Sequence, residues 1–450
     1  MQLFDRGRSP RSPFRAVTAA WCVPFLISVV SCGGPDEVDT GTSKAAAPSS
    51  STVAPAAVTI SAGATDVTEP GATDSTDGGA PSVAPTAAPS TDPPAAPSTD
   101  PPTKPTSGPA AAPGALDEAL AWPMRQKLAQ LMFTGFNSGP GAETDPAQAK
   151  ALIDLGVGGL FVGRKEVNLF GSDALLDARK NAVPPLVATD GEGGQVDVLP
   201  EIMDVLPAAR EMAAWDPSRI QEAASVRGTQ LLERGIDVDF APLLDVAGGA
   251  SPLGDRTWSS DPQEVIRTAG AFAEGLCQSG VMPTFKHFPG HGRADAHGDD
   301  APARTPPLED MQQLDLVPFR QLLSSMGDRS LVMTGHLDVP GLTASGTPFS
   351  LDPNAMTLLR DDLGYDGVAV TDELAEMGAI TQRGISVPDA VERALIAGND
   401  MALYFGDAKQ LGDVLDQLEE AVSVGRLSME RVDQSLTRVI TLKASGGCSV

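Results

Sequence analysis

The chain has 450 residues, of which 59 are acidic and 32 are basic, so that its formal net charge is −27. This acidic excess argues against a nucleic-acid partner, because phosphate backbones are bound by clustered Lys and Arg. The length exceeds that of one small domain and leaves room for a substantial core.

Residues 1–32 have the organisation of an export signal. Arginines precede an apolar run from Ala16 to Val30 that is too short to span a bilayer. The run ends at Cys32 in a small-residue site that resembles the bacterial lipobox, whose cysteine is acylated and becomes the new N-terminus. We therefore expect an exported protein that Cys32 anchors by a lipid to the outer face of the bacterial cell membrane. An ordinary cleaved signal with an incidental cysteine is the alternative.

Residues 33–113 are dominated by Ala, Pro, Ser, Thr and Asp and include Ser-Thr-Asp-Pro-Pro at both 90–94 and 98–102. Such a stretch buries too little apolar surface to offset the entropy lost on ordering, so we expect a disordered linker. Its proline content favours an extended spacer between the membrane and a folded domain.

Residues 114–450 contain eight short apolar runs separated by segments of helical periodicity, which is the pattern of buried parallel strands joined by crossover helices. This alternation predicts an α/β fold, specifically a single (β/α)8 TIM barrel. The expected strands are 128–136, 158–163, 185–190, 238–245, 282–287, 330–336, 367–372 and 400–405. The expected helices include 207–234, 261–279, 308–325, 352–363 and 387–397.

Ionisable residues end five of the eight expected strands. In a barrel these positions converge on the carboxyl-terminal face, where the active site of this architecture lies. All four histidines of the chain also fall within residues 287–336, which is hard to ascribe to packing. The strand-end residues are Asp190, Asp245, Lys286 with His287, His336 and Asp372.

Several motifs in this zone resemble glycoside hydrolase family 3, specifically its single-domain β-N-acetylhexosaminidase branch. The most specific is Lys-His-Phe-Pro-Gly-His-Gly at 286–292. Val-Thr-Asp-Glu-Leu at 370–374 is similar to the nucleophile strand of the family, and Gly-Asp-Arg-Thr at 254–257 is similar to its Gly-x-Arg-Ser/Thr turn. Matches at 190–194 and 397–401 complete the family's order over most of the predicted barrel.

The resemblance makes Asp372 the catalytic nucleophile. Hydrolysis through an oxocarbenium-like transition state needs a carboxylate at the anomeric carbon, and a retaining enzyme uses it to form a covalent glycosyl intermediate. The end of the seventh strand would hold it rigidly. A helix-capping aspartate is the alternative interpretation of Asp372.

In this branch of the family the acid/base is a histidine on a mobile loop after the fifth strand, supported by an aspartate in an Asp-x-His arrangement, in place of the customary second carboxylate. Asp295 and His297 fit that pattern, and a carboxylate partner would orient the imidazole and raise its pKa. The loop departs from the family's Asp-Ser-His, which stands a little further from the Gly-His-Gly. Asp299 therefore remains open as the partner of His297.

The resemblance assigns sugar hydroxyl binding to Asp190, Arg256, Lys286 and His287. Buried charged donors and acceptors can reject an analogue that lacks one hydroxyl, because a partner would be left unpaired. Gln195 stands where the family commonly has arginine. No cofactor is implied, and we expect a monomer.

The resulting hypothesis is a retaining β-N-acetylhexosaminidase that removes terminal non-reducing β-N-acetylglucosamine, from cell-wall (peptidoglycan) fragments in the case of an envelope protein. A β-glucosidase, an N-acetylglucosaminide phosphorylase and a non-catalytic sugar-binding lipoprotein remain as alternatives. A metal-dependent hydrolase is disfavoured, because Pro289 and Gly290 prevent His287 and His291 from sharing a helical face. Whether the two cysteines at 277 and 448 form a disulfide is open, since their spacing does not decide it.

Overall fold

The computed structural model describes residues 114–136, 144–197, 199 and 202–448. All of these belong to one compact unit. The predicted export signal, its Cys32 and the predicted linker lie outside the described residues. Among the residues that are described, no helix is long and apolar enough to cross a membrane.

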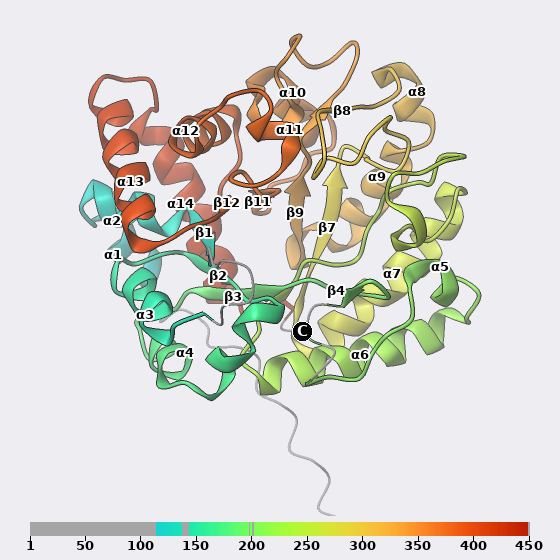
Figure 1. Cartoon of the computed structure of the whole chain (residues 1–450), viewed down its shortest axis with the longest axis horizontal. Helices are drawn as coiled ribbons and strands as arrows, with labels where there is room; N and C mark the ends of the chain where they lie inside the picture. The colour runs from blue at the N-terminus through green and yellow to red at the C-terminus, as the bar shows by residue number, and fades with distance from the viewer. Residues whose placement is uncertain (1–113, 137–143, 198, 200–201, 449–450) are drawn as a thin grey trace, which may run out of the picture. The chain divides into compact units, whose positions relative to one another are not determined.

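Eight parallel strands form one sheet in the order β11-β9-β7-β6-β3-β2-β1-β12. A bridge between Val370, in β11, and Met401, beside β12, closes the sheet on itself. Helices surround it in Figure 1. The predicted (β/α)8 barrel is therefore confirmed. The strands are β1 (Met132–Gly135), β2 (Gly159–Phe161), β3 (Leu186–Thr189), β6 (Val238–Asp239), β7 (Met282–Phe288), β9 (Leu331–Thr334), β11 (Ala369–Thr371) and β12 (Ala402–Phe405).

The strands are connected by helices and by two further pairs of short strands. β4 (Gly191–Gly193) pairs with β5 (Val196–Asp197), and β8 (Ala303–Arg304) pairs with β10 (Leu337–Asp338). The helices are α1 (Ala115–Leu120), α2 (Met124–Gln130), α3 (Pro146–Asp154), α4 (Asp173–Ala178), α5 (Ala209–Met212), α6 (Pro217–Glu233), α7 (Pro262–Ser279), α8 (Leu308–Gln313), α9 (Leu316–Met326), α10 (Pro353–Thr357), α11 (Gly378–Thr381), α12 (Val387–Ala397), α13 (Ala408–Ser423) and α14 (Met429–Ser445).

Three predicted boundaries were wrong. Leu128 lies in α2 and not in the first strand, because a buried helix end and a buried strand have the same apolar appearance. The expected helix at 207–234 is two helices, since Pro217 begins α6 as its first residue, where a proline is favoured. The expected helix at 308–325 is likewise interrupted, between α8 and α9.

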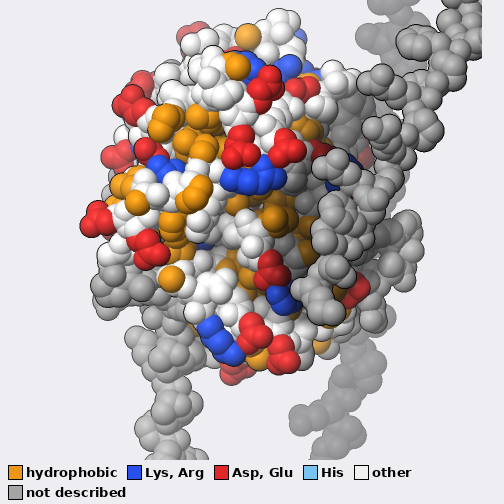
Figure 2. Space-filling view, turned by 90° about the vertical axis from the view of Figure 1, so that its left-hand side faces the viewer, with side chains coloured by type: hydrophobic (Ala, Val, Ile, Leu, Met, Phe, Trp, Pro, Cys, Tyr) orange, Lys and Arg blue, Asp and Glu red, His pale blue; other side chains and the backbone are white. Residues whose placement is uncertain are grey.

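The outer helices carry mixed charge. On the face that includes α3 and α13, basic side chains lie beside acidic ones and among apolar ones (Figure 2). Lys150 pairs with Asp154 along α3, and Lys409 pairs with Asp413 along α13, each four residues apart. This face has the character of a solvated helical surface and not of a basic binding stripe.

A disulfide joins Cys277, near the end of α7, to Cys448, three residues after α14 ends. The two Cα atoms are 4.9 Å apart, and 171 positions separate the cysteines in sequence. Because α7 leads into β7, the bond lies at the amino end of the barrel. Disulfides of this kind persist in oxidising compartments, which agrees with an extracytoplasmic location.

Candidate active site

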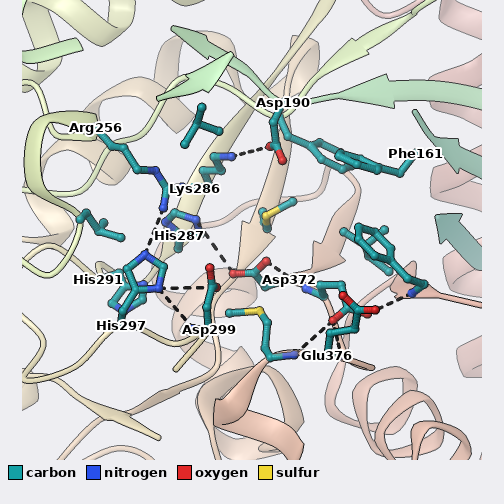
Figure 3. Close-up of a pocket in the computed structure, with 18 residues that line it drawn as sticks. Phe161, Asp190, Arg256, Lys286, His287, His291, His297, Asp299, Asp372 and Glu376 are labelled. Carbon is teal, nitrogen blue, oxygen red and sulfur yellow. Dashed lines mark hydrogen bonds and ion pairs between the residues drawn. The ribbon is translucent and has the colours of Figure 1, made fainter. Parts of the chain in front are cut away.

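A cavity of about 440 Å³ opens at the carboxyl ends of the barrel strands (Figure 3). Asp190 follows β3, Lys286 and His287 lie near the end of β7, and Asp372 follows β11. Arg256 and His297 reach the cavity from the loops after β6 and β7. Of the described residues that the sequence singled out for catalysis or binding, these six line the cavity and Asp295 does not.

Asp372 is held at the floor of the cavity. Its backbone N–H donates to the carbonyl of Thr334 in β9, at 3.0 Å, and Oδ1 accepts from the N–H of Glu373 at 2.9 Å. Oδ2 lies 4.0 Å from Nε2 of His287. Burial would raise the pKa of Asp372, but His287 and His336 outweigh it and hold that pKa below its usual value. The carboxylate is therefore ionised at neutral pH.

Asp245 fixes the orientation of His287. Its fully buried carboxylate lies 2.8 Å from Nδ1 of His287 and also accepts the backbone N–H groups of His287 and His291. Burial would raise the pKa of Asp245, but His287 lowers it below the usual range. An ionised Asp245 keeps a proton on Nδ1 of His287, which leaves Nε2 directed at Asp372.

The other two buried histidines hold backbone and side-chain groups of the site in place. Burial, with His287 beside it, lowers the pKa of His291 to about 4, so this ring is uncharged at pH 7. Its Nε2 lies 3.1 Å from the carbonyl of Ala296. Burial also lowers the pKa of His336, whose Nε2 lies 2.9 Å from the carbonyl of Glu373 and whose Nδ1 lies 2.7 Å from the hydroxyl of Ser350. His336 thus supports the backbone directly after Asp372.

Glu192 bridges two basic side chains of the site, those of Lys286 and Arg256. It lies 2.6 Å from Nζ of Lys286 and accepts two hydrogen bonds from the guanidinium of Arg256, both at 2.8 Å. Lys286 also contacts Asp190 at 2.8 Å. Burial would raise the pKa of Glu192, but Lys286 and Arg256 lower it to about 2. Glu192 thus fixes the positions of both cations.

Glu192 was missed as a site residue by the sequence reasoning, although it stands within the Asp-x-Glu-Gly-Gly motif. The available signal was its spacing of two from Asp190, because on extended backbone such residues point to the same side. Burial raises the pKa of Asp190 despite Lys286, so the two carboxyl groups have shifted pKa values of opposite direction.

The loop after β7 brings His297 to the rim of the cavity. Its Nε2 lies 3.3 Å from Nη1 of Arg256, and its Nδ1 lies 3.5 Å from Oδ1 of Asp299. Asp295 has a different position: its backbone N–H donates to the carbonyl of Arg304, and its carboxylate accepts the N–H of Arg304 at 2.7 Å. The structure therefore brings Asp299, and not Asp295, to His297.

Aromatic side chains form the apolar part of the cavity. Phe161 at the end of β2, Phe240 after β6 and Phe405 at the end of β12 all line it. The ring of Phe161 stacks between the other two, with centroid distances of 5.9 Å to Phe240 and 5.4 Å to Phe405. Such a surface suits the C–H face of a sugar ring and excludes water. These three residues were not predicted from the sequence. They could have been identified as aromatic residues that stand at the end of an expected strand or directly after it.

The cavity therefore combines an ionised carboxylate, an imidazole at the rim, charged hydrogen-bonding groups and an apolar wall. Within the described ranges, no group of three or more His, Cys, Asp or Glu side chains is arranged to hold a metal ion. This set of groups can bind a small polyhydroxylated ligand, attack an electrophilic carbon and transfer a proton to a leaving group.

Known glycosidases resemble the chain in sequence and fold. Residues 123–442 match the N-terminal domain of glycosyl hydrolase family 3. The β-hexosaminidase LpqI of Mycobacterium tuberculosis is 41% identical over 337 residues, which cover 72% of this chain and 84% of LpqI. The crystal structure of a family member from Mycobacterium smegmatis superposes with a TM-score of 0.67 at 40% identity, over 72% of this chain and 98% of that one. A β-N-acetylglucosaminidase from Paenibacillus sp. FPU-7 gives a TM-score of 0.66 at 33% identity, over 73% of this chain and 64% of that one.

Proposed function

The chain belongs to glycoside hydrolase family 3, and from this premise we propose how it acts: it removes terminal β-N-acetylglucosamine by double displacement, with Asp372 as nucleophile. It is a glycoside hydrolase of the β-hexosaminidase class. The observation that carries the mechanism is the ionised Asp372, which faces a sugar-sized cavity from a rigid strand end.

In the first step, a carboxylate oxygen of Asp372 attacks the anomeric carbon and the bond to the leaving-group oxygen breaks. His297 gives a proton to that oxygen, so the aglycone departs as a neutral alcohol. Asp299 contacts Nδ1 of His297 in two ways. Its backbone N–H donates to Nδ1 of the neutral ring at 3.3 Å, and its carboxylate, 3.5 Å from the same nitrogen, stabilises the imidazolium. This role replaces the one that the sequence motif suggested for Asp295.

In the second step, water attacks the same carbon and His297 takes its proton. The bond between the sugar and Asp372 breaks, which restores the free carboxylate and releases the sugar with its original anomeric configuration. His287 and His336 lower the pKa of Asp372, which makes this carboxylate a better leaving group in the second step.

Asp190, Lys286, Arg256 and His287 are the proposed contacts to the sugar's hydroxyl and acetamido groups. Glu192 holds the two cations at fixed positions, so their donors meet the ligand without reorganising. The rings of Phe161, Phe240 and Phe405 supply the apolar surface beneath the sugar ring.

We also propose that the protein acts on cell-wall fragments outside the cytoplasmic membrane, anchored through Cys32. The disulfide between Cys277 and Cys448 supports an oxidising location. The similarity to a β-hexosaminidase, together with the lipobox-like sequence before Cys32, supports an N-acetylglucosamine-containing substrate met at the envelope. Metabolic labelling with an alkyne-bearing fatty acid tests the anchor: wild type incorporates the label, and Cys32→Ala does not.

The experiment that tests the enzymatic proposal compares p-nitrophenyl β-N-acetylglucosaminide with p-nitrophenyl β-glucoside, each with and without added phosphate. We expect turnover of the first substrate that phosphate does not accelerate. Asp372→Ala should abolish it, and Asp361→Ala, at an exposed carboxylate away from the cavity, should not. Preference for the glucoside would make the protein a β-glucosidase, dependence on phosphate would make it a phosphorylase, and binding without turnover would make it a sugar-binding protein.

A further inference from the structure

The backbone that follows the nucleophile folds into a compact turn, here called the nucleophile turn and comprising residues 373–382. The carboxylate of Glu373 accepts the N–H groups of Ala375 and Glu376, at 2.7 and 2.5 Å, and that of Phe405 in β12 at 3.0 Å. It also accepts the N–H of Met377 at 3.3 Å. The turn is thus closed on a buried carboxylate and tied to the neighbouring barrel strand.

The nucleophile turn binds the loop that carries His297. The N–H of Gly378 donates to the carbonyl of Asp299 at 2.8 Å, and the N–H of Ala379 donates to the carbonyl of Gly298 at 2.9 Å. The side-chain amide of Gln382 donates to the carbonyl of Asp300. Three successive carbonyls, directly after His297, are therefore held by donors from one turn.

The same loop is also fixed at its base. The backbone N–H of Asp295 donates to the carbonyl of Arg304, and the carboxylate of Asp295 accepts the N–H of Arg304. Hydrogen bonds from the N–H groups of Asp300 and Ala301 to the carbonyl of His297 tighten the segment between the two attachment points. Asp295, at this base, does not line the cavity, whereas the contacts to the nucleophile turn are made by the residues directly after His297.

Gly378 is the residue that allows this close contact. A Cβ atom at this position would lie 2.4 Å from the carbonyl oxygen of Asp300 and 2.5 Å from its carbonyl carbon. Both are backbone atoms, so no side-chain rotation relieves the overlap. Any residue other than glycine therefore displaces the loop or the turn.

We propose that Gly378 is a positioning residue: it lets the nucleophile turn dock the His297 loop against the cavity, which sets where the acid/base stands relative to Asp372. The inference rests on the proposed function, because it uses the roles given there to His297 and Asp372. A displaced loop impairs protonation of the leaving group and leaves the attack by Asp372 largely intact. The loss of kcat/KM must therefore be larger for a substrate whose leaving group needs protonation to depart.

The test is kcat/KM of Gly378→Ala on two N-acetylglucosaminides, one with a p-nitrophenol leaving group and one with an unactivated sugar alcohol. We expect a loss of about 100-fold on the unactivated substrate, the size associated with a misplaced catalytic group, and of less than about 10-fold on the activated one. His297→Ala should likewise lose more kcat/KM on the unactivated substrate than on the activated one. Gly412→Ala in α13, where an added Cβ meets nothing within 4 Å, is the matched control and should behave as wild type.

Gln382→Ala provides a second variant that does not depend on the crowded position. The side chain of Gln382 is exposed, so the variant should fold. It removes one of the three contacts to the loop, so kcat/KM should fall less than in Gly378→Ala and should again fall more on the unactivated substrate. Equal losses on both substrates, or no loss in either variant, would overturn the inference while the enzymatic proposal stands. If wild type turned over neither substrate, the proposed function would fail, and the inference with it.

Discussion

Both ends of the barrel bury carboxylates among cations, yet the two arrangements differ. At the amino end, Asp400 precedes β12 and is fully buried, with contacts to Arg360 at 2.6 Å, Arg431 at 3.0 Å and Arg438 at 3.3 Å. The hydroxyl of Ser435 donates to it at 2.9 Å. At the carboxyl end, Asp372 keeps 17% of its side chain exposed to the cavity.

Asp400 and Asp372 also share the direction of their pKa shifts. In both, burial would raise the pKa, and neighbouring basic side chains hold it below the usual value instead. A low pKa in a buried carboxylate is therefore no mark of an active site by itself. The difference is that side chains of the protein surround Asp400, whereas Asp372 faces space for a ligand.

The strongest test of this comparison exchanges each carboxylate for an amide. Asp372→Asn should lower kcat by about 10⁴-fold or more, because the nucleophile is lost, while the melting temperature stays close to that of wild type. Asp400→Asn should lower the free energy of unfolding by about 3–5 kcal/mol, because three arginines lose their counter-ion. The folded fraction of this variant should keep the wild-type kcat.

Urea unfolding and active-site titration separate these outcomes. Asp366, which is almost fully exposed beside Arg438, provides a control whose conversion to Asn should change neither quantity. Loss of kcat in folded Asp400→Asn would mean that the amino end contributes to catalysis, against the comparison.

The disulfide should affect stability alone, because it lies at the amino end. Replacing both Cys277 and Cys448 by serine should cost about 2–5 kcal/mol of unfolding free energy, since the bond closes a long loop of chain. Steady-state kinetics at 25 °C should be unchanged. A fall in kcat at constant unfolding free energy would contradict this assignment.

Lys443 should give the amino end a pH-dependent stability. Burial lowers the pKa of this lysine to about 7, with Asp237 opposing the shift, and its Nζ contacts Gln130 at 2.9 Å. Between pH 7 and the unfolded value of 10.5 the folded state binds fewer protons than the unfolded state, so stability rises with pH. Relative to Lys443→Met, the unfolding free energy of wild type should rise by up to about 1.4 kcal/mol per pH unit in this range. Matched urea titrations at several pH values measure it, and parallel curves would refute the assignment.

Glu192 should give the carboxyl end a smaller window of the same sign at acid pH. Its pKa falls from 4.5 to about 2, so its contribution is present above pH 4.5 and is lost as the pH falls toward 2. Glu192→Gln should flatten this part of the stability curve. Acid unfolding monitored by circular dichroism tests it, and an acid limb as steep as that of wild type would show that Lys286 and Arg256 do not depend on this charge.

The barrel could be predicted from sequence because its signal is repeated. Each buried strand has its own apolar run, and the fifth, expected at 282–287, is β7 from Met282 to Phe288. Boundaries were less accessible where burial is the same in helix and strand, as at Leu128. The pairing of Cys277 with Cys448 could not be deduced either, since it depends on α7 and the chain end meeting at the amino end of the barrel.

Much of the candidate site could also be predicted from the sequence, because the carboxyl ends of the strands converge in any barrel. Asp190, Lys286, His287 and Asp372 all come from such positions. The carboxylate partner of His297 could not be predicted from the sequence, because it depends on the conformation of the loop after β7. The carboxylate of Asp295 accepts the N–H of Arg304 and does not line the cavity. The contact of the loop with Gly378 joins residues far apart in sequence, so the spacing within the loop could not predict it.

The most direct test of the mechanism is to trap its intermediate. A fluorinated N-acetylglucosaminyl fluoride, which slows the second step more than the first, should add one sugar to the intact protein by mass spectrometry. We expect peptide mapping to locate that sugar on Asp372 and to find none on Asp372→Ala. A stable adduct on another residue such as Glu373, or steady turnover without any adduct, would contradict the assignment of Asp372 as nucleophile.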